Sequence, residues 1–490
     1  MTDSPILVQL PLFPEMSLSL GMPGKQPDLH TLFQHRECLP AFITDCAPAM
    51  RILDLLGPLH WDDFPERNLQ RNWSQSTIPY TAFIAAELVK LNEGQSSFGR
   101  LHRYLIEHPA FISLLGFPLV PAPNSAPGFN TLASLPTQRH MTRMLHQLPN
   151  TALQFLLADS VKLIGAELAA RGITWGDCVS LDTKHIVAWV QDAKRNPKAY
   201  VTNRFDKTKQ PAGDPDCRLG CKRKHNQSVA PRTPTRNSVP ASSAKAGEYY
   251  WGYGSGVVVT KVPGYGEFVI AELTQPFDHG DLTYFFPLMQ QVEQRLGHQP
   301  HFGTFDAAFD AWYVYTYFSA ENGNSDGMAA VPFSEKGGYK ANGRHFAPDG
   351  LPLCVAGLPM PLQYAYTDRT TCLIEHPRGR YICPIHFGQT HRRTCPVHDE
   401  RFAKDGCVVM MPLSIGARLR YQIDRDSDVY KDLYRQRTAC ERINSQAVAL
   451  GIERPHLRNG TAIANQNTLI YVLINLRFLQ RLCCGLRQDA

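Results

Sequence analysis

DVYKDLYRQRTACERINSQAVAL, residues 428–450, is the stretch on which the interpretation of the whole chain rests. The spacings between its apolar residues are four, seven, three, four and three positions, which fit one face of an α-helix. The predicted buried stripe comprises Val429, Leu433, Cys440, Ile443, Ala447 and Leu450. We therefore expect one continuous helix over this stretch.

Three polar residues lie beside this stripe. Tyr434, Arg437 and Glu441 are separated by three and four residues, so a helix brings their side chains close together at the edge of the core. A solvated helix face is the common explanation for such a trio. A functional role requires partners from elsewhere in the chain.

Composition indicates a globular protein with room for two to four domains. The chain has 490 residues, of which 43% are hydrophobic and 19% charged. The N-terminus lacks the basic start of a signal peptide, and the apolar run at residues 469–476 is too short to span a bilayer. Thirteen cysteines, an odd number, argue against a disulfide framework. We expect a cytoplasmic protein.

Positive charge is concentrated in one segment. Residues 194–247 contain 13 Lys and Arg against three Asp, a local charge of +10 in a chain whose net charge is +6. This concentration points to a polyanionic partner, with Lys222, Arg223 and Lys224 as candidate contacts. The Pro, Ser, Thr and Asn content predicts a loop, mobile over residues 230–245.

The first third of the chain is predicted to be mainly helical. Residues 1–60 are Pro-rich and poorly defined, whereas 82–91 read as an amphipathic helix and 97–106 as a second helix capped by Ser96 or Ser97. Such helix pairs suit a DNA-binding helix-turn-helix, but packing or dimerisation explains them equally well.

Two aspartates mark the strands that follow. After a long helix at 151–171, residues 177–190 read as a strand with Asp182 in its middle. An acid within an apolar strand costs several kcal/mol unless it is paired or metal-bound, although an edge strand could expose it. Asp306 ends a later short strand. Asp310 is a rival acid that we interpret as a helix cap.

The remaining elements complete the order strand, strand, strand, helix, strand, helix, strand. Strands at 249–262 and 267–273 form a hairpin joined at Pro263-Gly264, and a helix at 282–296 leads to the Asp306 strand. A helix from about Asp310 and a short strand at 329–333 follow. This is the element order of an RNase H-like nucleotidyl transferase.

At this point the chain resembles the DDE transposases of bacterial insertion sequences, in the branch with a Tyr-x2-Arg-x3-Glu-x6-Lys signature. Tyr434, Arg437 and Glu441 match that signature, but Val448 stands where the family has Lys. Asp182 within SLDTK and Asp306 within FDAAFDA resemble the first two acids. The resemblance covers most of residues 75–480.

The resemblance implies an α/β fold: an RNase H-like mixed sheet flanked by helices, with an all-α N-terminal region and an insertion before the last catalytic helix. The expected organisation is a poorly defined segment (1–60), a helical DNA-binding or dimerisation domain (61–150), the first part of the core with its basic loop (151–329), an insertion domain (330–415), and the second part of the core (416–484).

The resemblance also implies a site and an activity. Asp182, Asp306 and Glu441 would hold Mg²⁺ or Mn²⁺, which prefer carboxylate oxygens, while Tyr434 and Arg437 position a DNA phosphate. The expected protein is a cytoplasmic, nucleoid-associated homodimer that cuts the terminal inverted repeats of its element and joins them to target DNA. The alternatives are a nuclease or resolvase without strand transfer, and a domesticated, inactive DNA-binding protein.

Cysteines in the insertion suggest a second metal site. Cys383-Pro-Ile-His386 and Cys395-Pro-Val-His398 are two Cys-x2-His pairs, and four such ligands suit tetrahedral zinc. Buried Cys-Pro turns would explain the same pattern without a metal. Cys217 and Cys221 have no second pair nearby, so we interpret them as reduced thiols.

Overall fold

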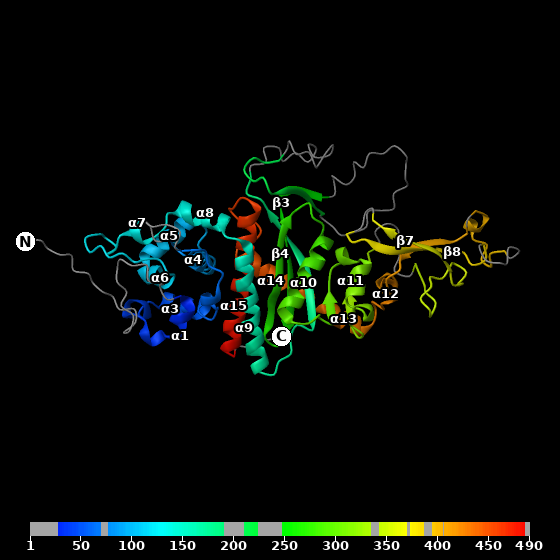
Figure 1. Cartoon of the computed structure of the whole chain (residues 1–490), viewed down its shortest axis with the longest axis horizontal. Helices are drawn as coiled ribbons and strands as arrows, with labels where there is room; N and C mark the ends of the chain where they lie inside the picture. Colours follow the sequence, from blue (N-terminus) through cyan, green and yellow to red (C-terminus); the bar gives the residue numbers. More distant parts are fainter. Residues whose placement is uncertain are drawn as a thin grey trace, which may run out of the picture.

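The structure, a computed structural model, describes most of the chain. The described segments are residues 28–69, 77–190, 210–223, 247–334, 343–369, 373–386, 394–404 and 406–485. They form an elongated molecule with a sheet near its middle (Figure 1). N-terminal helices lie at one end, and a separate three-stranded sheet extends at the other.

Six strands form the central sheet. They are β1 (Cys178–Val187), β2 (Arg218–Arg223), β3 (Gly247–Val262), β4 (Gly266–Pro276), β5 (Phe302–Thr304) and β6 (Met328–Ala330). β1 pairs antiparallel with β3 on one side and parallel with β5 on the other. β3 also pairs antiparallel with β2 and β4, and β5 pairs parallel with β6. The predicted α/β class with a mixed sheet is confirmed.

The hairpin between β3 and β4 forms where the sequence predicts it. Gly264 and Gly266, in the turn after Pro263, both have positive φ angles, which glycine adopts at little cost. One part of the basic segment differs from the prediction: β2, at residues 218–223, is a strand paired to β3 rather than a loop. The prediction of mobility for 230–245 falls outside the described residues.

Helices cover both faces of the sheet. They include α9 (Asn150–Ala170), α10 (Phe285–Leu296), α11 (Trp312–Tyr317) and α15 (Gly460–Cys483). Alternate strand residues face opposite layers, so Val257 and Val259 pack in the core with α15, whereas Val258 packs with α10. Asn475 of α15 bonds both the N–H and the carbonyl of Val269, at a bulge in β4. This pairing fixes α15 against the sheet.

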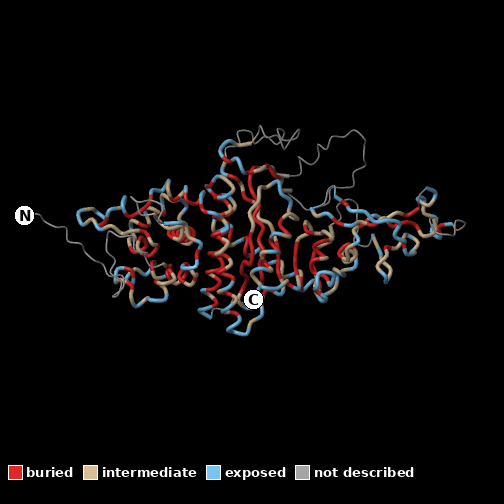
Figure 2. The backbone as a smooth tube through the Cα atoms, in the orientation of Figure 1, coloured by how far each residue is buried: buried red, intermediate tan, exposed pale blue. Residues whose placement is uncertain are grey.

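The N-terminal helices share a continuous core with the α9–α15 side of the sheet (Figure 2). They are α1 (Leu29–Gln34), α2 (Ala41–Thr44), α3 (Ala47–Leu56), α4 (Tyr80–Asn92), α5 (Phe98–Glu107), α6 (Pro109–Leu114), α7 (Thr131–Ser134) and α8 (Gln138–Gln147). Ser97 caps α5 as predicted. The prediction of an amphipathic α4 is wrong: residues 82–91 are all buried, since neighbouring helices surround it.

The insertion builds its own antiparallel sheet. Its strands are β7 (Leu362–Asp368), β8 (His376–Ile382) and β9 (Val408–Pro412), and α12 (Gly416–Gln422) leads back to the core. Most of β7 is exposed, and the apolar cluster beneath this sheet is small. Short 3₁₀ helices complete the described fold: η1 (Arg36–Cys38), η2 (Trp61–Asp63), η5 (Asp281–Tyr284), η6 (Ala307–Phe309), η7 (Ala320–Asn322) and η9 (Glu400–Ala403).

The helix predicted over residues 428–450 is two helices, α13 (Asp428–Arg435) and α14 (Thr438–Ala449). The turn between them exposes the carbonyl of Gln436, which accepts a hydrogen bond from Ser180 of β1 at 3.2 Å. The predicted stripe is buried from Leu433 to Ala447, but Val429, in the first turn of α13, is 71% exposed. Within the described segments, no helix is both long enough and apolar enough to cross a membrane.

Candidate functional site

Asp182 and Asp306 each come two residues after a residue of the paired parallel strands β1 and β5. β1 and β5 pair Ser180 with Thr304, and the two hydroxyl oxygens lie 2.7 Å apart in the core. Asp182 is two residues farther along β1, and Asp306 lies two residues beyond Thr304, the last residue of β5. Burial raises the pKa of Asp182, and the negative charge of nearby Asp306 adds to this effect. The structure therefore brings these two predicted acids together.

The environment of Asp182 resists its ionisation. Burial raises the pKa of Asp182 to about 6, and the charges of Asp306 and Asp281 act in the same direction. The guanidinium of Arg437 opposes this shift. Asn444 of α14 donates a hydrogen bond from Nδ2 to Oδ2 of Asp182 at 3.0 Å. Asp182 is thus held at the junction of β1 and α14.

Asp306 is also the N-cap of the 3₁₀ helix η6. Its backbone is extended, and its Oδ1 accepts a hydrogen bond from the N–H of Ala308 at 2.8 Å. This local bond fixes the carboxylate just after β5.

Arg437 is the cation of the site. Its Nη2 contacts Oε1 of Glu441 at 2.7 Å, one helical turn away. Burial lowers the pKa of Arg437, but the charges of Tyr434 and of all three predicted acids outweigh burial and raise it. The guanidinium therefore interacts with Asp182, Asp306 and Glu441 together.

The third predicted acid does not join the other two in a metal-binding arrangement. The side chain of Glu441 is 56% exposed and turns toward Arg437. Among the residues that the structure describes, no group of three or more His, Cys, Asp or Glu side chains is arranged to hold a metal ion. The acids share an internal cation in this conformation.

Asp281 is a fourth carboxylate that sequence reasoning missed. It begins η5, and its Oδ1 accepts a hydrogen bond from the hydroxyl of Thr183 at 2.7 Å. Its charge contributes to the raised pKa of Asp182. The only sequence signal is the acidic run DHGD after β4, which by itself reads as a turn.

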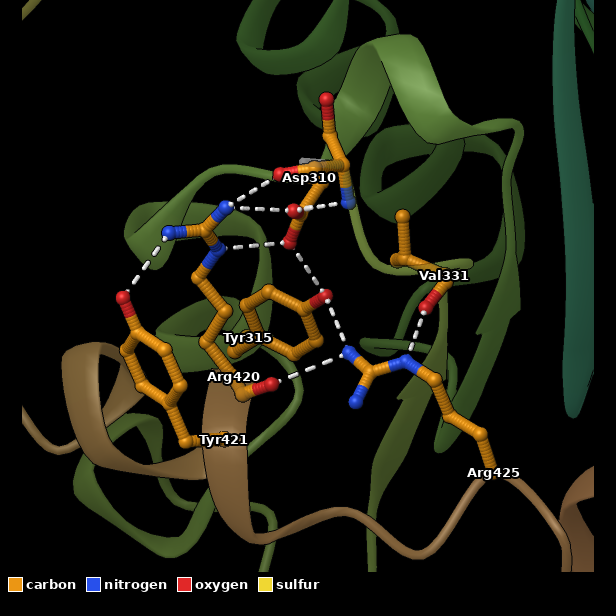
Figure 3. A network of polar contacts seen from close by, with 7 residues as sticks. Asp310, Tyr315, Val331, Arg420, Tyr421 and Arg425 are labelled. Carbon is orange, nitrogen blue, oxygen red and sulfur yellow. Dashed lines mark hydrogen bonds and ion pairs between the residues drawn. The ribbon is translucent and has the colours of Figure 1, made fainter. Parts of the chain in front are cut away.

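The interpretation of Asp310 as a helix cap is wrong. Its side chain is 1% exposed and forms two hydrogen bonds with Arg420, of 2.9 and 2.7 Å (Figure 3). It also accepts bonds from the Tyr315 hydroxyl and the Ser334 N–H, each at 2.7 Å. Asp310 lies after β5 and bonds Arg420 of α12, so it links the insertion to the core. It does not cap α11.

The four predicted zinc ligands are not brought into one group. Cys383 and Cys395 are both buried, but Cys383 packs in a cluster with Cys407 and with the partly buried Cys354. The ring of His386 contacts Phe402, with ring centres 5.4 Å apart. His398 lies in a turn with a φ of 50°. Cys383 therefore shares its apolar cluster with Cys407 and Cys354, whereas the prediction grouped it with His386, Cys395 and His398.

The structure describes Tyr434, Lys222 and Arg223 among the remaining predicted DNA-binding residues, but not Lys224. Tyr434 stacks on Tyr430 of the same helix, with ring centres 5.9 Å apart. Lys222 and Arg223 belong to β2, and Lys224 lies outside the described residues.

Comparison of the chain with models of protein families, with curated proteins and with solved structures finds no significant match.

Proposed function

We propose that this protein is a metal-dependent DNA transposase that cuts the ends of an insertion sequence and joins them to target DNA. The observation that carries the proposal is the set of contacts that joins β1 to β5 and α14: Ser180 contacts Thr304 and the carbonyl of Gln436, and Asn444 bonds Asp182, so the two aspartates lie near the Arg437–Glu441 pair. The reaction is the one that the resemblance to DDE transposases implies, and the geometry of the site supports it.

The strand order favours an RNase H-like core. β4, β3 and β1 are antiparallel neighbours, and β5 and β6 continue the sheet in parallel, in the element order expected for that fold. This order makes β1 central, so its acid is adjacent to the acid at the end of β5. Fold alone does not define an activity, so the proposal rests on these side chains.

The residue types suit divalent metal chemistry. Asp182, Asp306 and Glu441 would hold Mg²⁺ or Mn²⁺, hard cations that prefer oxygen ligands. When bound, such ions activate the attacking oxygen and stabilise the leaving oxygen of a phosphodiester. The buried side-chain oxygen of Asn444, whose Nδ2 donates to Asp182, has no hydrogen-bond partner among the described residues and would offer the cation a further oxygen ligand.

Arg437 and Tyr434 would bind DNA, and this would release Glu441 from its ion pair. A phosphate competes with a carboxylate for a guanidinium, so DNA at this site would draw Arg437 away from Glu441. Glu441, on the exposed side of α14, would then be available to turn toward Asp182. Metal binding and DNA binding would therefore reinforce one another.

The other expected properties remain part of the proposal. A homodimer would pair two element ends in the bacterial cytoplasm, and the basic segment including Lys222, Arg223 and Lys224 would contact DNA; the salt dependence of DNA binding tests that contact. Zinc would stabilise the insertion by drawing Cys383, His386, Cys395 and His398 together, because that sheet has little apolar core of its own. Metal analysis of the purified protein tests the zinc proposal.

The decisive experiment compares Asp182→Asn with wild-type protein on DNA that carries the element ends, in Mg²⁺ or Mn²⁺. We expect cleavage to be lost while DNA binding is retained, because Asn keeps the side-chain shape but not the charge. Asp177→Asn, at an exposed position just before β1, is the matched control and should cleave normally. Cleavage by Asp182→Asn would exclude the metal assignment.

The products of the same reaction distinguish the alternative functions. Joined donor–target molecules indicate a transposase, whereas cut ends without joining indicate a nuclease or resolvase that uses the same acids. Binding without any cleavage by wild-type protein would favour the domesticated DNA-binding protein.

A further inference from the structure

Asn444 is a buried amide in direct contact with the proposed site. It lies three residues after Glu441 on α14, and its side chain is 9% exposed. Nδ2 donates to Oδ2 of Asp182, but Oδ1 is buried and has no hydrogen-bond partner within the part of the chain that the structure describes. A buried acceptor without a partner costs about 1–3 kcal/mol. If Asn444 only anchored the helix, its unpaired oxygen would therefore destabilise the fold without any benefit.

A purely structural contact between α14 and β1 would need only a donor. Asn444 presents an oxygen as well, on the same amide plane that contacts Asp182. Rotating the amide by 180° would bring Oδ1 against the carboxylate, and two acceptors would then face each other. Oδ1 lacks a partner in the observed orientation and would face an acceptor in the rotated one, so in both it requires a cation or a proton donor.

The charge of the surroundings explains why an amide, rather than another acid, would serve here. Asp182 already experiences the negative charges of Asp306 and Asp281. A further carboxylate would add repulsion that a neutral oxygen does not. Amide carbonyl oxygens are accepted ligands of hard divalent cations.

We propose that Asn444 belongs to the cation site: its Nδ2 orients Asp182, and its Oδ1 supplies a neutral oxygen to the divalent cation or to a water that the cation holds. This inference rests on the proposed function and adds a residue to the same site. Because Glu441 and Asn444 lie one turn apart on α14, one helix would bring both a charged and a neutral oxygen to the cation.

The test measures Mn²⁺ binding by the full-length protein without DNA, from the electron paramagnetic resonance signal of free Mn²⁺. Asn444→Leu preserves side-chain size but removes both polar atoms, and we expect its Mn²⁺ affinity to fall about tenfold or more. Asn444→Asp retains an oxygen and should bind Mn²⁺ at least as tightly as wild type. Ser445→Ala, at the next and exposed position of α14, is the control and should bind normally.

Stability and cleavage measurements separate the possible results. If Asn444→Leu does not fold, Asn444→Ala replaces it, with folding checked by circular dichroism. Equal Mn²⁺ affinity in folded Asn444→Leu and wild type would overturn the role of Asn444 alone, provided that wild type still cleaves DNA and Asp182→Asn does not. Equal Mn²⁺ affinity in wild type and Asp182→Asn would overturn the proposed function and this inference together.

Discussion

Arg437 is the residue whose charge faces all three predicted acids. In a protein without bound metal, it offsets repulsion among carboxylates that the fold holds on one side of the sheet. It also keeps Glu441 turned outward through the 2.7 Å contact. One side chain thus stabilises the site as observed and, under the proposed function, would compete with metal binding.

Replacing Arg437 tests this double role. Arg437→Gln should reduce cleavage at least tenfold, because a charge-assisted phosphate contact is lost, and Arg437→Lys should lose less because it keeps the charge. Cleavage rates at saturating Mg²⁺ provide the measurement. Arg435→Gln is the control, since Arg435 is 73% exposed and pairs only at the surface with Asp432. Equal losses in both Gln variants would contradict a specific role for Arg437.

At the scale of elements, the network around Asp310 connects the insertion to the core (Figure 3). Arg420 of α12 bonds Asp310, and Arg425 bonds the Tyr315 hydroxyl at 3.0 Å and the Val331 carbonyl at 2.9 Å. These contacts fix the segment that runs directly into α13. The position of the Arg437–Glu441 pair therefore depends on a network that contains neither residue.

Breaking this network should destabilise the fold strongly. Asp310→Asn would leave the guanidinium of Arg420, which is 16% exposed, without its counter-charge. We expect a loss of about 3 kcal/mol in the free energy of unfolding, measured by urea denaturation. Asp432→Asn, which disrupts an exposed pair, should cost less than about 1 kcal/mol. A loss that small for Asp310→Asn would show that the network is not required for stability.

At the scale of the whole molecule, a buried acid lies where β4, α9 and α15 meet. Glu272 accepts hydrogen bonds from Gln154 of α9, at 2.6 Å, and from Thr468 of α15. Burial raises the pKa of Glu272 to about 7 and lowers the pKa of nearby Arg295 to about 10. The packing of the N-terminal side against the sheet is thus linked to a titrating group.

This linkage predicts a pH dependence. The folded chain keeps the Glu272 proton up to about pH 7, whereas the unfolded chain releases it near 4.5. Rising pH between these values therefore favours unfolding, by roughly 3 kcal/mol for this group. Glu272→Gln should lose less stability than wild type between pH 5 and pH 8 in urea titrations. Glu375→Gln, at an exposed position, should behave as wild type, and equal slopes for all three proteins would refute the prediction.

The sequence by itself determined the features that depend on near neighbours. The Ser97 cap, the hairpin turn at Gly264 and the apolar period of α14 each involve residues a few positions apart, so local chemistry is enough to predict them. It also identified Asp182 and Asp306, because acids that end or interrupt apolar strands are conspicuous in a pattern of side chains.

Only the tertiary structure decided what surrounds those acids. Asn444 and Asp182 are 262 positions apart, and Asp310 and Arg420 are 110 apart, so packing alone brings each pair together. The same packing turned Glu441 toward Arg437. Sequence spacing placed Glu441 on the expected helix face. The direction of a long, exposed side chain depends, however, on the charged groups that the fold places near it.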